Sequence, residues 1–117
     1  MSHSPRARSL LSTLLACATL ALATPTATAF DEAAAKALAK QNDCFKCHAV
    51  DKTKKGPSYQ KIAAKYKGKP DGEEKAIKNI TMGQKVKLED GTEEDHKIID
   101  TKDPKELKNL VQWILAQ

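Results

Sequence analysis

The sequence predicts a small all-α domain whose centre is filled by something other than its own side chains. Four segments carry apolar residues at helical spacing, and the stretches between them are rich in glycine, proline and charge. The whole chain holds only five aromatic residues: Phe30, Phe45, Tyr59, Tyr66 and Trp113. A domain of this size buries a modest share of its surface and often needs a metal, a disulfide or a cofactor to be stable.

Residues 1–29 have the pattern of a leader that precedes the domain. They begin with two arginines and no acid, continue through an apolar stretch from Leu10 to Ala23, and end in Ala27-Thr28-Ala29. This is the order of a secretory signal peptide. The apolar stretch of 14 residues is shorter than the roughly 20 that a membrane-spanning helix needs. We therefore expect cleavage after Ala29 and one mature domain, residues 30–117.

A rival interpretation of the leader uses Cys17. Leu14-Leu15-Ala16-Cys17 would then be a lipoprotein site whose cysteine carries a lipid anchor. Because a leucine directly before Ala16 fits that signal poorly, the cleaved secretory signal is the favoured interpretation. His3 would be removed with the leader, and we assign it no role.

The mature chain is rich in lysine but nearly balanced in charge. It keeps 18 lysines and all 15 acidic residues, because both arginines of the sequence lie in the leader, and its formal charge is +3. No basic patch is interleaved with aromatic residues, so the sequence gives no reason to expect a nucleic-acid partner.

The first two helices are expected before and after a break at Gly56-Pro57. The first runs from Asp31 to about Gln41, is rich in alanine, and would place Ala34, Ala37 and Leu38 on one face. Its small residues would allow another helix to cross closely. The second carries an apolar stripe at i, i+3, i+4 and i+7 from Tyr59 to Tyr66.

The third and fourth helices enclose a long loop. The third covers about Glu73 to Thr81, and the last begins at Pro104, with Asp103 as its cap and Glu106 completing an Asp-x-x-Glu box. The last helix carries the apolar stripe Leu107, Leu110, Val111 and Ile114, broadened by Trp113 and Leu115. Residues 82–102 are expected to form a loop with a turn at Asp90-Gly91, and a loop of this length is usually functional or disordered.

The strongest signal in the sequence is Cys44-Phe45-Lys46-Cys47-His48. In an exported chain, Cys-x-x-Cys-His is typical of the attachment of a c-type haem. Two thiols three positions apart on a helical turn can reach the two vinyl groups of one porphyrin and form thioethers. The next residue, His48, then presents its imidazole to the iron from one face. Both mature cysteines are used in this way, so none is left for a disulfide.

Two other chemistries could use the same pair of cysteines. A reactive dithiol, as in thioredoxin-like proteins, requires a βαβ setting, which four helical segments do not provide. Half of a zinc site would need a second ligand pair at short spacing, and only His96 is left for it. We therefore expect one covalently bound haem c, with its iron, as the cofactor.

With these motifs, the mature chain resembles the class I c-type cytochromes, small bacterial periplasmic proteins with one haem. The resemblance covers nearly the whole mature chain: a helix running into CFKCH, then HAVDKTKKGPSYQKIAAKY, then the terminal helix ELKNLVQWIL. It implies a cytochrome c fold in which about four helices wrap around the haem and the first and last helices cross. It also implies that the Pro57 carbonyl accepts a hydrogen bond from the other ring nitrogen of His48, which would fix the tautomer.

The second axial ligand is where the chain departs from the family. The family's usual ligand is a methionine in the loop before the last helix, commonly followed by prolines, and this chain has no such Met-Pro pair. Its only mature methionine, Met82, comes 34 residues after His48, at the end of the third helix. His96 comes 48 residues after His48, nearer to the last helix. We therefore favour His96 as the distal ligand, with Met82 as the alternative.

Further occupants of the distal position stay open. His96 lies among six acids in EDGTEEDHKIID and could be an ordinary surface histidine. The same loop offers Lys85, Lys87 and Lys97, and water or an open site would also be compatible. Bis-histidine ligation would lower the reduction potential relative to His/Met relatives, because imidazole is the stronger donor to ferric iron. Since protonated imidazole does not bind metal, ligation should weaken as the pH falls.

A haem with both axial positions filled has no room for a substrate, so the sequence predicts electron transfer between periplasmic redox proteins, not an enzyme. In relatives, lysines around the haem edge steer docking to acidic partners. The candidates in this chain, which could equally be a solubilising face, are Lys46, Lys52, Lys54 and Lys55.

Two other functions stay open. One is a gas- or ligand-binding haem sensor with a displaceable distal loop ligand. The other is a subunit dedicated to one periplasmic dehydrogenase. The acids between Glu89 and Asp95 could meet a basic partner instead of an acidic one. In each case we expect a monomer or a subunit of a redox complex, without a membrane span.

Overall fold

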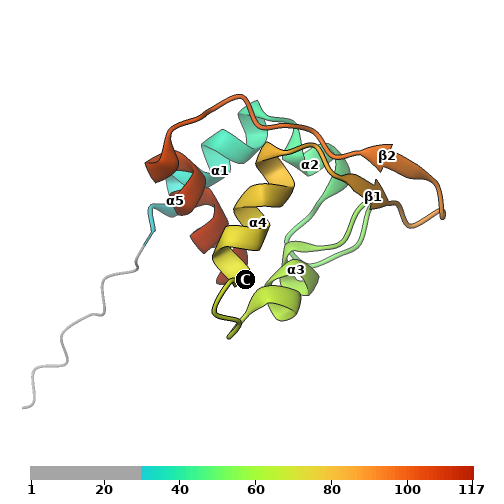
Figure 1. The fold of residues 1–117 in the computed structure, drawn as a ribbon, viewed down its shortest axis with the longest axis horizontal. Coiled ribbons are helices and arrows are strands. Elements are labelled where there is room, and N and C mark those ends of the chain that lie inside the picture. Colours follow the sequence, from blue (N-terminus) through green and yellow to red (C-terminus); the bar gives the residue numbers. More distant parts are fainter. Residues whose placement is uncertain (1–29) are drawn as a thin grey trace, which may run out of the picture.

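Five helices and one short β-hairpin make up residues 30–117, the part of the chain that this computed structural model describes (Figure 1). The elements are α1 (Glu32–Gln41), α2 (Cys44–Cys47), α3 (Tyr59–Tyr66), α4 (Gly72–Thr81), β1 (Lys85–Lys87), β2 (Glu93–Asp95) and α5 (Pro104–Leu115). The mostly helical fold is confirmed, with the four longer helices where the sequence predicts them. The expected leader, with His3 and Cys17, lies outside the described residues. None of the described helices has the length and apolar composition needed to cross a membrane.

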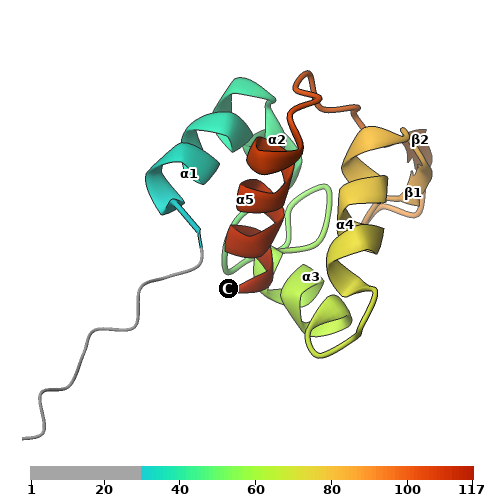
Figure 2. The same ribbon diagram turned by 60° about the vertical axis from the view of Figure 1, so that its left-hand side comes forward.

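The first and last helices pack against each other. Figure 2 shows α5 between α1 on one side and α4 on the other. Ala35 and Ala39 of α1 are fully buried and share the main hydrophobic cluster with Leu110 and Trp113 of α5. Because alanine side chains are short, the two helices can cross closely at this point.

The buried face of α1 differs from the expected one. Ala34 and Ala37 are exposed, and Leu38 is only partly buried. The helix carries alanines on nearly every side, so its apolar pattern does not select one face. In α5, by contrast, the predicted stripe is the buried one: Leu107, Leu110, Val111, Trp113 and Ile114.

Helix α5 begins where the sequence predicts, but its capping box is indirect. Oδ1 of Asp103 accepts a hydrogen bond from the N–H of Lys105 at 2.9 Å. Glu106 does not bond the Asp103 backbone; its carboxylate accepts from the hydroxyl of Thr101. That hydroxyl in turn accepts from the N–H of Asp103 at 3.2 Å. Thr101 therefore relays the reciprocal half of the box, because a hydroxyl both donates and accepts.

The long loop before α5 contains a β-hairpin that its sequence did not predict. Strands β1 and β2 pair in antiparallel register, with Lys85 opposite Asp95 and Lys87 opposite Glu93. The opposite charges across this pair favour the register. The turn is at the predicted place, with Gly91 in the left-handed conformation (φ 86°). The hairpin projects from the helical body (Figure 1).

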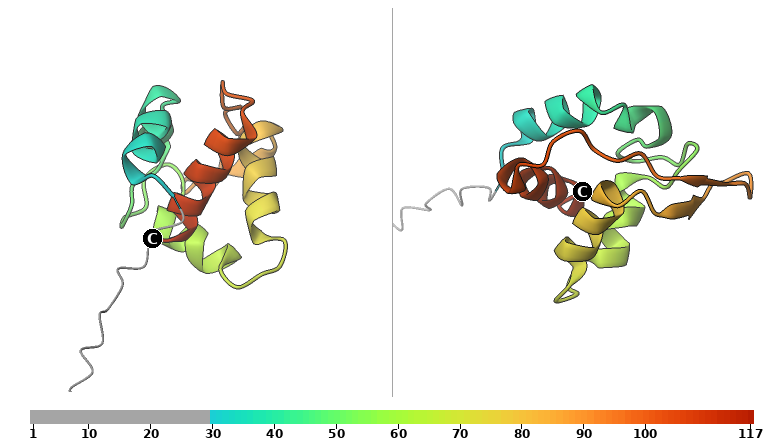
Figure 3. Two further views of the ribbon diagram at one scale, coloured as in Figure 1. Left: turned by 90° about the vertical axis from the view of Figure 1, so that its left-hand side faces the viewer. Right: turned by 45° about the horizontal axis from the view of Figure 1, so that its top comes forward.

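The stretch from β2 to α5 passes between the α1–α2 corner and α4 (Figure 3). The N–H of Ile99 donates to the carbonyl of Ile80 at the end of α4, at 2.8 Å. The N–H of Asp100 donates to Oδ1 of Asn42, which follows α1, at 2.9 Å. These two bonds fix the course of the chain directly after His96.

Candidate cofactor site

A cavity of about 1180 Å³ opens between α3, α4, α5 and the β-hairpin. It is larger than the roughly 300–1,000 Å³ of most small-molecule pockets. Both cysteines of the motif line it, together with His48 and His96. Part of the remaining wall is apolar and comes from α3 and α5: Ile62, Leu110, Val111 and Ile114. The cavity explains how so few aromatic residues suffice for the core.

The Cys-x-x-Cys-His motif forms one turn of helix that ends at the histidine. The N–H of His48 donates to the carbonyl of Cys44 at 2.9 Å. This turn presents both thiols to the cavity, and neither Cys44 nor Cys47 is in a disulfide. Burial raises the pKa of the Cys44 thiol. A raised pKa disfavours the thiolate that a reactive dithiol would need.

Two neighbours hold the ring of His48. Its Nδ1 lies 2.6 Å from the carbonyl oxygen of Pro57, the hydrogen bond that the family resemblance implies. Its ring stacks on Tyr59, with centroids 5.5 Å apart and planes 22° apart. Burial lowers the pKa of His48, and the hydrogen bond to Pro57 opposes this shift. The ring is thereby favoured in its neutral form, which is the form that binds metals.

Gly56 makes room for this arrangement. A Cβ at this position would lie 2.9 Å from Cε1 of His48 and 3.3 Å from its Nδ1. Only a residue without a side chain lets the loop that carries Pro57 approach the imidazole so closely. The sequence marks Gly56-Pro57 as a helix break, but it does not reveal this contact with the histidine.

His96 lies across from His48. The two ring centroids are 6.2 Å apart, and the ring planes are inclined by 35°. Nδ1 of His96 lies 2.8 Å from the carbonyl oxygen of Lys97, so each histidine has its Nδ1 on a backbone carbonyl. Within residues 30–117, neither Nε2 has a hydrogen-bond partner. His96 is half-buried and lines the cavity, unlike an ordinary surface histidine.

Met82 is placed differently. It caps the C-terminal end of α4, its side chain is 62% exposed, and it does not belong to the cavity wall. The structure therefore brings His96, and not Met82, to His48. The lysines weighed as distal ligands, Lys85, Lys87 and Lys97, do line the cavity.

The zinc alternative finds no support in the described part of the chain. Residues 30–117 contain no cluster of three or more His, Cys, Asp or Glu side chains arranged to hold a metal ion. A structural zinc ion requires four such ligands.

The comparison with known proteins agrees with this geometry. The sequence model of the family described as Cytochrome c matches residues 32–117. The chain belongs to the cytochrome c family. Cytochrome c-552 of Hydrogenobacter thermophilus is 33% identical over 79 residues, which cover 68% of this chain and 76% of that protein. Cytochrome c-551 of Pseudomonas denitrificans is 32% identical over 79 residues, which cover 68% and 92%.

Solved structures place this cytochrome in class I. The class 1 cytochrome MtoD from Sideroxydans lithotrophicus ES-1 is 57% identical and superimposes with a TM-score of 0.72, covering 75% of this chain and 97% of that one. Cytochrome c552 of Nitrosomonas europaea is 30% identical, with a TM-score of 0.54 and coverages of 68% and 95%. This cytochrome is therefore an electron-transfer haem protein of the class I fold, with one covalently attached haem c and its iron.

The residues of the cavity fit that group. The motif offers two thiols and an imidazole, and the opposite wall offers a second imidazole. The hydroxyl of Tyr59 is buried and has no hydrogen-bond partner among residues 30–117, although its side chain lines the cavity. Burial also raises the pKa of this phenol. A buried polar group of this kind ordinarily has a hydrogen-bond partner. The hydroxyl of Tyr59 therefore fits a cavity that holds a polar cofactor.

The four lysines proposed for docking do not form one patch at the cavity. Only Lys46 lines it, and this lysine forms an ion pair with Asp43 at 3.2 Å. The ammonium group of Lys54 donates to the carbonyl of Phe45. Lys54 and Lys55 border a smaller cavity beside the hairpin turn. The sequence did not single out five of the lysines at the main cavity, and it named three others only as possible distal ligands: Lys61, Lys65, Lys69, Lys75 and Lys78 are the five, and Lys85, Lys87 and Lys97 are the three.

Proposed function

We propose that this cytochrome is a periplasmic carrier of single electrons in which Cys44 and Cys47 hold the haem covalently and His48 and His96 bind its iron. When bound, haem c supplies an iron that accepts and releases one electron. The observation that carries the proposal is the pair of imidazoles that face each other across the cavity, each with its Nδ1 on a backbone carbonyl.

The separation of the two rings supports a shared metal ion. Two imidazoles that bind one metal from opposite sides, at metal–nitrogen distances of about 2.0–2.1 Å, have ring centres about 6 Å apart. The observed separation is 6.2 Å. Met82 has no comparable position, because it is exposed and is not among the described residues that line the cavity.

The backbone carbonyls of Pro57 and Lys97 define what each imidazole can do. A neutral imidazole that donates from Nδ1 keeps its lone pair on Nε2. Because both Nδ1 atoms lie within hydrogen-bond distance of a carbonyl, both rings are held as the tautomer whose Nε2 binds a metal. With one imidazole on each side of the iron, no position is left for a substrate, which supports a carrier rather than an enzyme.

The charge around the cavity supports docking to an acidic redox partner. Among residues 30–117, nine lysines but only three acidic residues line the cavity. Several of these lysines are in ion pairs, whereas Lys65, Lys69 and Lys87 are in none of the ion pairs of the described residues. A positive rim of this kind accelerates association with a negative surface and loses this effect as salt is added.

The pattern of residues 1–29 supports export. A basic start, a short apolar stretch and Ala27-Thr28-Ala29 are the features of a cleaved signal peptide. The mature cytochrome would then begin at Phe30 and act in the periplasm, where its redox partners would also be found.

Two variants of the holoprotein test the ligand assignment. His96→Ala is expected to change the low-spin absorption spectrum of the ferric protein, because it removes the distal nitrogen. Met82→Ala is expected to leave the spectrum unchanged, because this side chain is exposed. The opposite pattern, with a sulfur-to-iron band that disappears only in Met82→Ala, would refute the assignment. Rapid binding of carbon monoxide by the unmodified ferrous protein would instead favour a ligand-binding sensor.

A further inference from the structure

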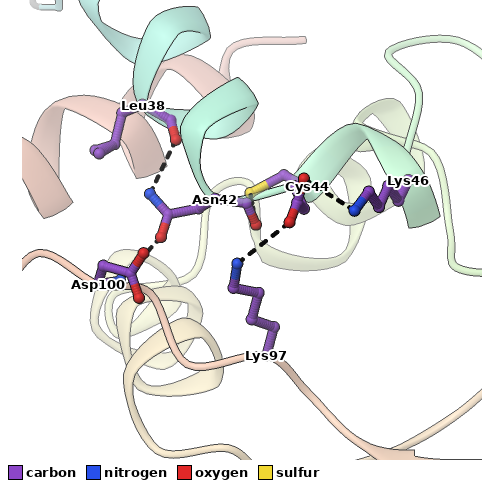
Figure 4. Close-up of polar contacts among 7 residues, drawn as sticks. Leu38, Asn42, Cys44, Lys46, Lys97 and Asp100 are labelled. Atoms are coloured by element: carbon purple, nitrogen blue, oxygen red, sulfur yellow. Dashed lines mark hydrogen bonds and ion pairs between the residues drawn. The ribbon is translucent and has the colours of Figure 1, made fainter.

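The segment that carries His96 is tied to the cysteine motif by the residue two positions before Cys44. We call residues 96–100 the distal segment. Asn42 is only 4% exposed, and its side-chain amide is used at both ends (Figure 4). Its Nδ2 donates to the carbonyl of Leu38 at 3.0 Å, and its Oδ1 accepts from the N–H of Asp100 at 2.9 Å. This amide therefore joins α1 to the distal segment across 58 residues of sequence.

Asp43, the next residue, makes a second tie. It adopts the left-handed backbone conformation (φ 58°), which is uncommon for residues other than glycine. Its carboxylate lies 3.2 Å from Nζ of Lys46 and 3.6 Å from Nζ of Lys97. The carbonyl of Lys97 is the group that lies 2.8 Å from Nδ1 of His96. Asp43 thus holds the side chain of the residue whose backbone orients the distal imidazole.

The other side of the distal segment is held by backbone bonds alone. The N–H of His96 donates to the carbonyl of Gln84 at 2.9 Å, and the N–H of Ile99 donates to the carbonyl of Ile80 at 2.8 Å. Both acceptors belong to the stretch that leads into the projecting hairpin, whose strands are three residues long. Within residues 30–117, the bond to Asn42 is the only hydrogen bond between the motif side, residues 42–57, and the distal segment.

We propose that Asn42 and Asp43 are positioning residues that hold the distal segment so that His96 stays in place opposite His48. The inference rests on the proposed function, because it takes His96 to be the distal ligand. Short exposed strands open locally at little free-energy cost. A side-chain clamp from the motif itself makes such opening rarer, because the distal segment must then break contacts on both sides before it moves.

The test compares Asn42→Ala with Asn109→Ala in the holoprotein. Asn109 is a matched control, since its amide also makes two bonds to a distant backbone: Oδ1 accepts from the N–H of Asp31 at 2.6 Å and Nδ2 donates to the Asp31 carbonyl at 2.9 Å. Those bonds join α1 to α5, away from the distal segment. Both variants are expected to lower the thermal midpoint.

Only Asn42→Ala is expected to free the distal segment. Carbon monoxide should bind to its ferrous form about tenfold faster or more, because a buried donor and acceptor lose their partner. The amide protons of His96 and Ile99 should exchange faster by a similar factor. In Asn109→Ala, both quantities should stay within about twofold of the unmodified protein.

Asp43→Gly separates the positioning of the distal segment from general stability. It also tests the proposal if Asn42→Ala does not fold. Glycine adopts the left-handed conformation without strain, so the thermal midpoint should not fall. Carbon monoxide binding should nevertheless become about two- to fivefold faster, a modest effect because the ion pair to Lys97 is exposed. Lys97→Gln should reproduce that increase.

Two outcomes would overturn the proposal. One is that Asn42→Ala lowers the thermal midpoint but leaves carbon monoxide binding and the exchange of His96 and Ile99 within about twofold, as Asn109→Ala does. The other, where Asn42→Ala does not fold, is that Asp43→Gly and Lys97→Gln leave both rates unchanged. Failure of the ligand assignment looks different, because His96→Ala would then leave the ferric spectrum unchanged. The exchange rates still report on the clamp in that case.

Discussion

At the scale of single residues, the cofactor site depends on backbone groups as much as on the motif. Pro57 and Lys97 each offer a carbonyl to the Nδ1 atom of one histidine. Gly56 lets the first of these carbonyls come within reach of its imidazole. In the proposed site, the side chains at 48 and 96 would supply the metal-binding nitrogens, and the carbonyls of Pro57 and Lys97 determine which ring nitrogen is free.

Gly56→Ala is expected to disturb the proximal histidine. Its Cβ would lie 2.9 Å from Cε1 of His48, and overpacking of this kind costs about 1–3 kcal/mol of unfolding free energy. Gly68→Ala is the control, because this glycine has a left-handed backbone (φ 74°) and an added Cβ would contact nothing within 4 Å outside its chain neighbours. Chemical denaturation should show a lower free energy of unfolding in both variants, but the reduction potential should shift only in Gly56→Ala. Equal potentials in the two variants would contradict the role given to Gly56.

The stability of the holoprotein is expected to fall as the pH drops below about 6.5, the ordinary pKa of histidine. Burial lowers the pKa of His48 in the folded state. The unfolded state therefore binds more protons than the folded state just below this pH, which favours unfolding. The exposed carboxylates of Asp43, Asp71 and Asp90 have pKa values below the ordinary 3.8, so they titrate outside this window. The free energy of unfolding, measured by chemical denaturation, should decrease from pH 7 to pH 5. A free energy that does not change over this range would argue against a neutral buried His48.

At the scale of secondary-structure elements, the sequence predicted the long helices well and the loops poorly. The stripe in α5 has one strongly apolar face, so its buried side could be read directly. The alanines of α1 carry no such preference, and the predicted face was wrong. The hairpin escaped prediction because its strands have three residues each and are largely exposed. The role of Asn42 was not predicted, because its hydrogen-bond partner, the N–H of Asp100, lies 58 residues away in the sequence.

Asp71 and Asp103 both occupy the N-cap position of their helices, but only Asp103 makes a side-chain cap bond. Asp103 precedes α5 and accepts from the N–H of Lys105, whereas Asp71 precedes α4 without a side-chain cap bond. Asp103→Ala is expected to cost about 1 kcal/mol of unfolding free energy. Asp71→Ala should leave it nearly unchanged, since it loses only the exposed ion pair with Lys75. If urea denaturation shows the same decrease in unfolding free energy for both variants, the cap bond of Asp103 does not stabilise α5.

At the scale of the whole molecule, helices and hairpin enclose a cavity with a positive rim. The motif gives one wall, α3 and α5 give apolar side chains, and the distal segment closes the side opposite His48. The sequence predicted the cofactor because its attachment motif depends on local spacing. The rim could not be predicted, because its nine lysines come from four elements and the intervening loops.

Reaction with a small anionic oxidant, ferricyanide, is expected to slow as salt is added. The ferrous protein should react fastest at low ionic strength, because the lysines around the cavity attract the anion. Replacing Lys65 and Lys69 together by glutamate should slow the reaction and flatten its salt dependence. Lys36→Glu on α1 is the control, since Lys36 does not line the cavity. Stopped-flow rates that respond equally to both changes would rule out a directing role for the rim.

Iron X-ray absorption on the ferric holoprotein shows whether His48 and His96 bind one iron from opposite sides. The expected first shell holds six nitrogens and no sulfur. A sulfur atom in that shell, or a shell of only five ligands, would contradict the proposed ligation.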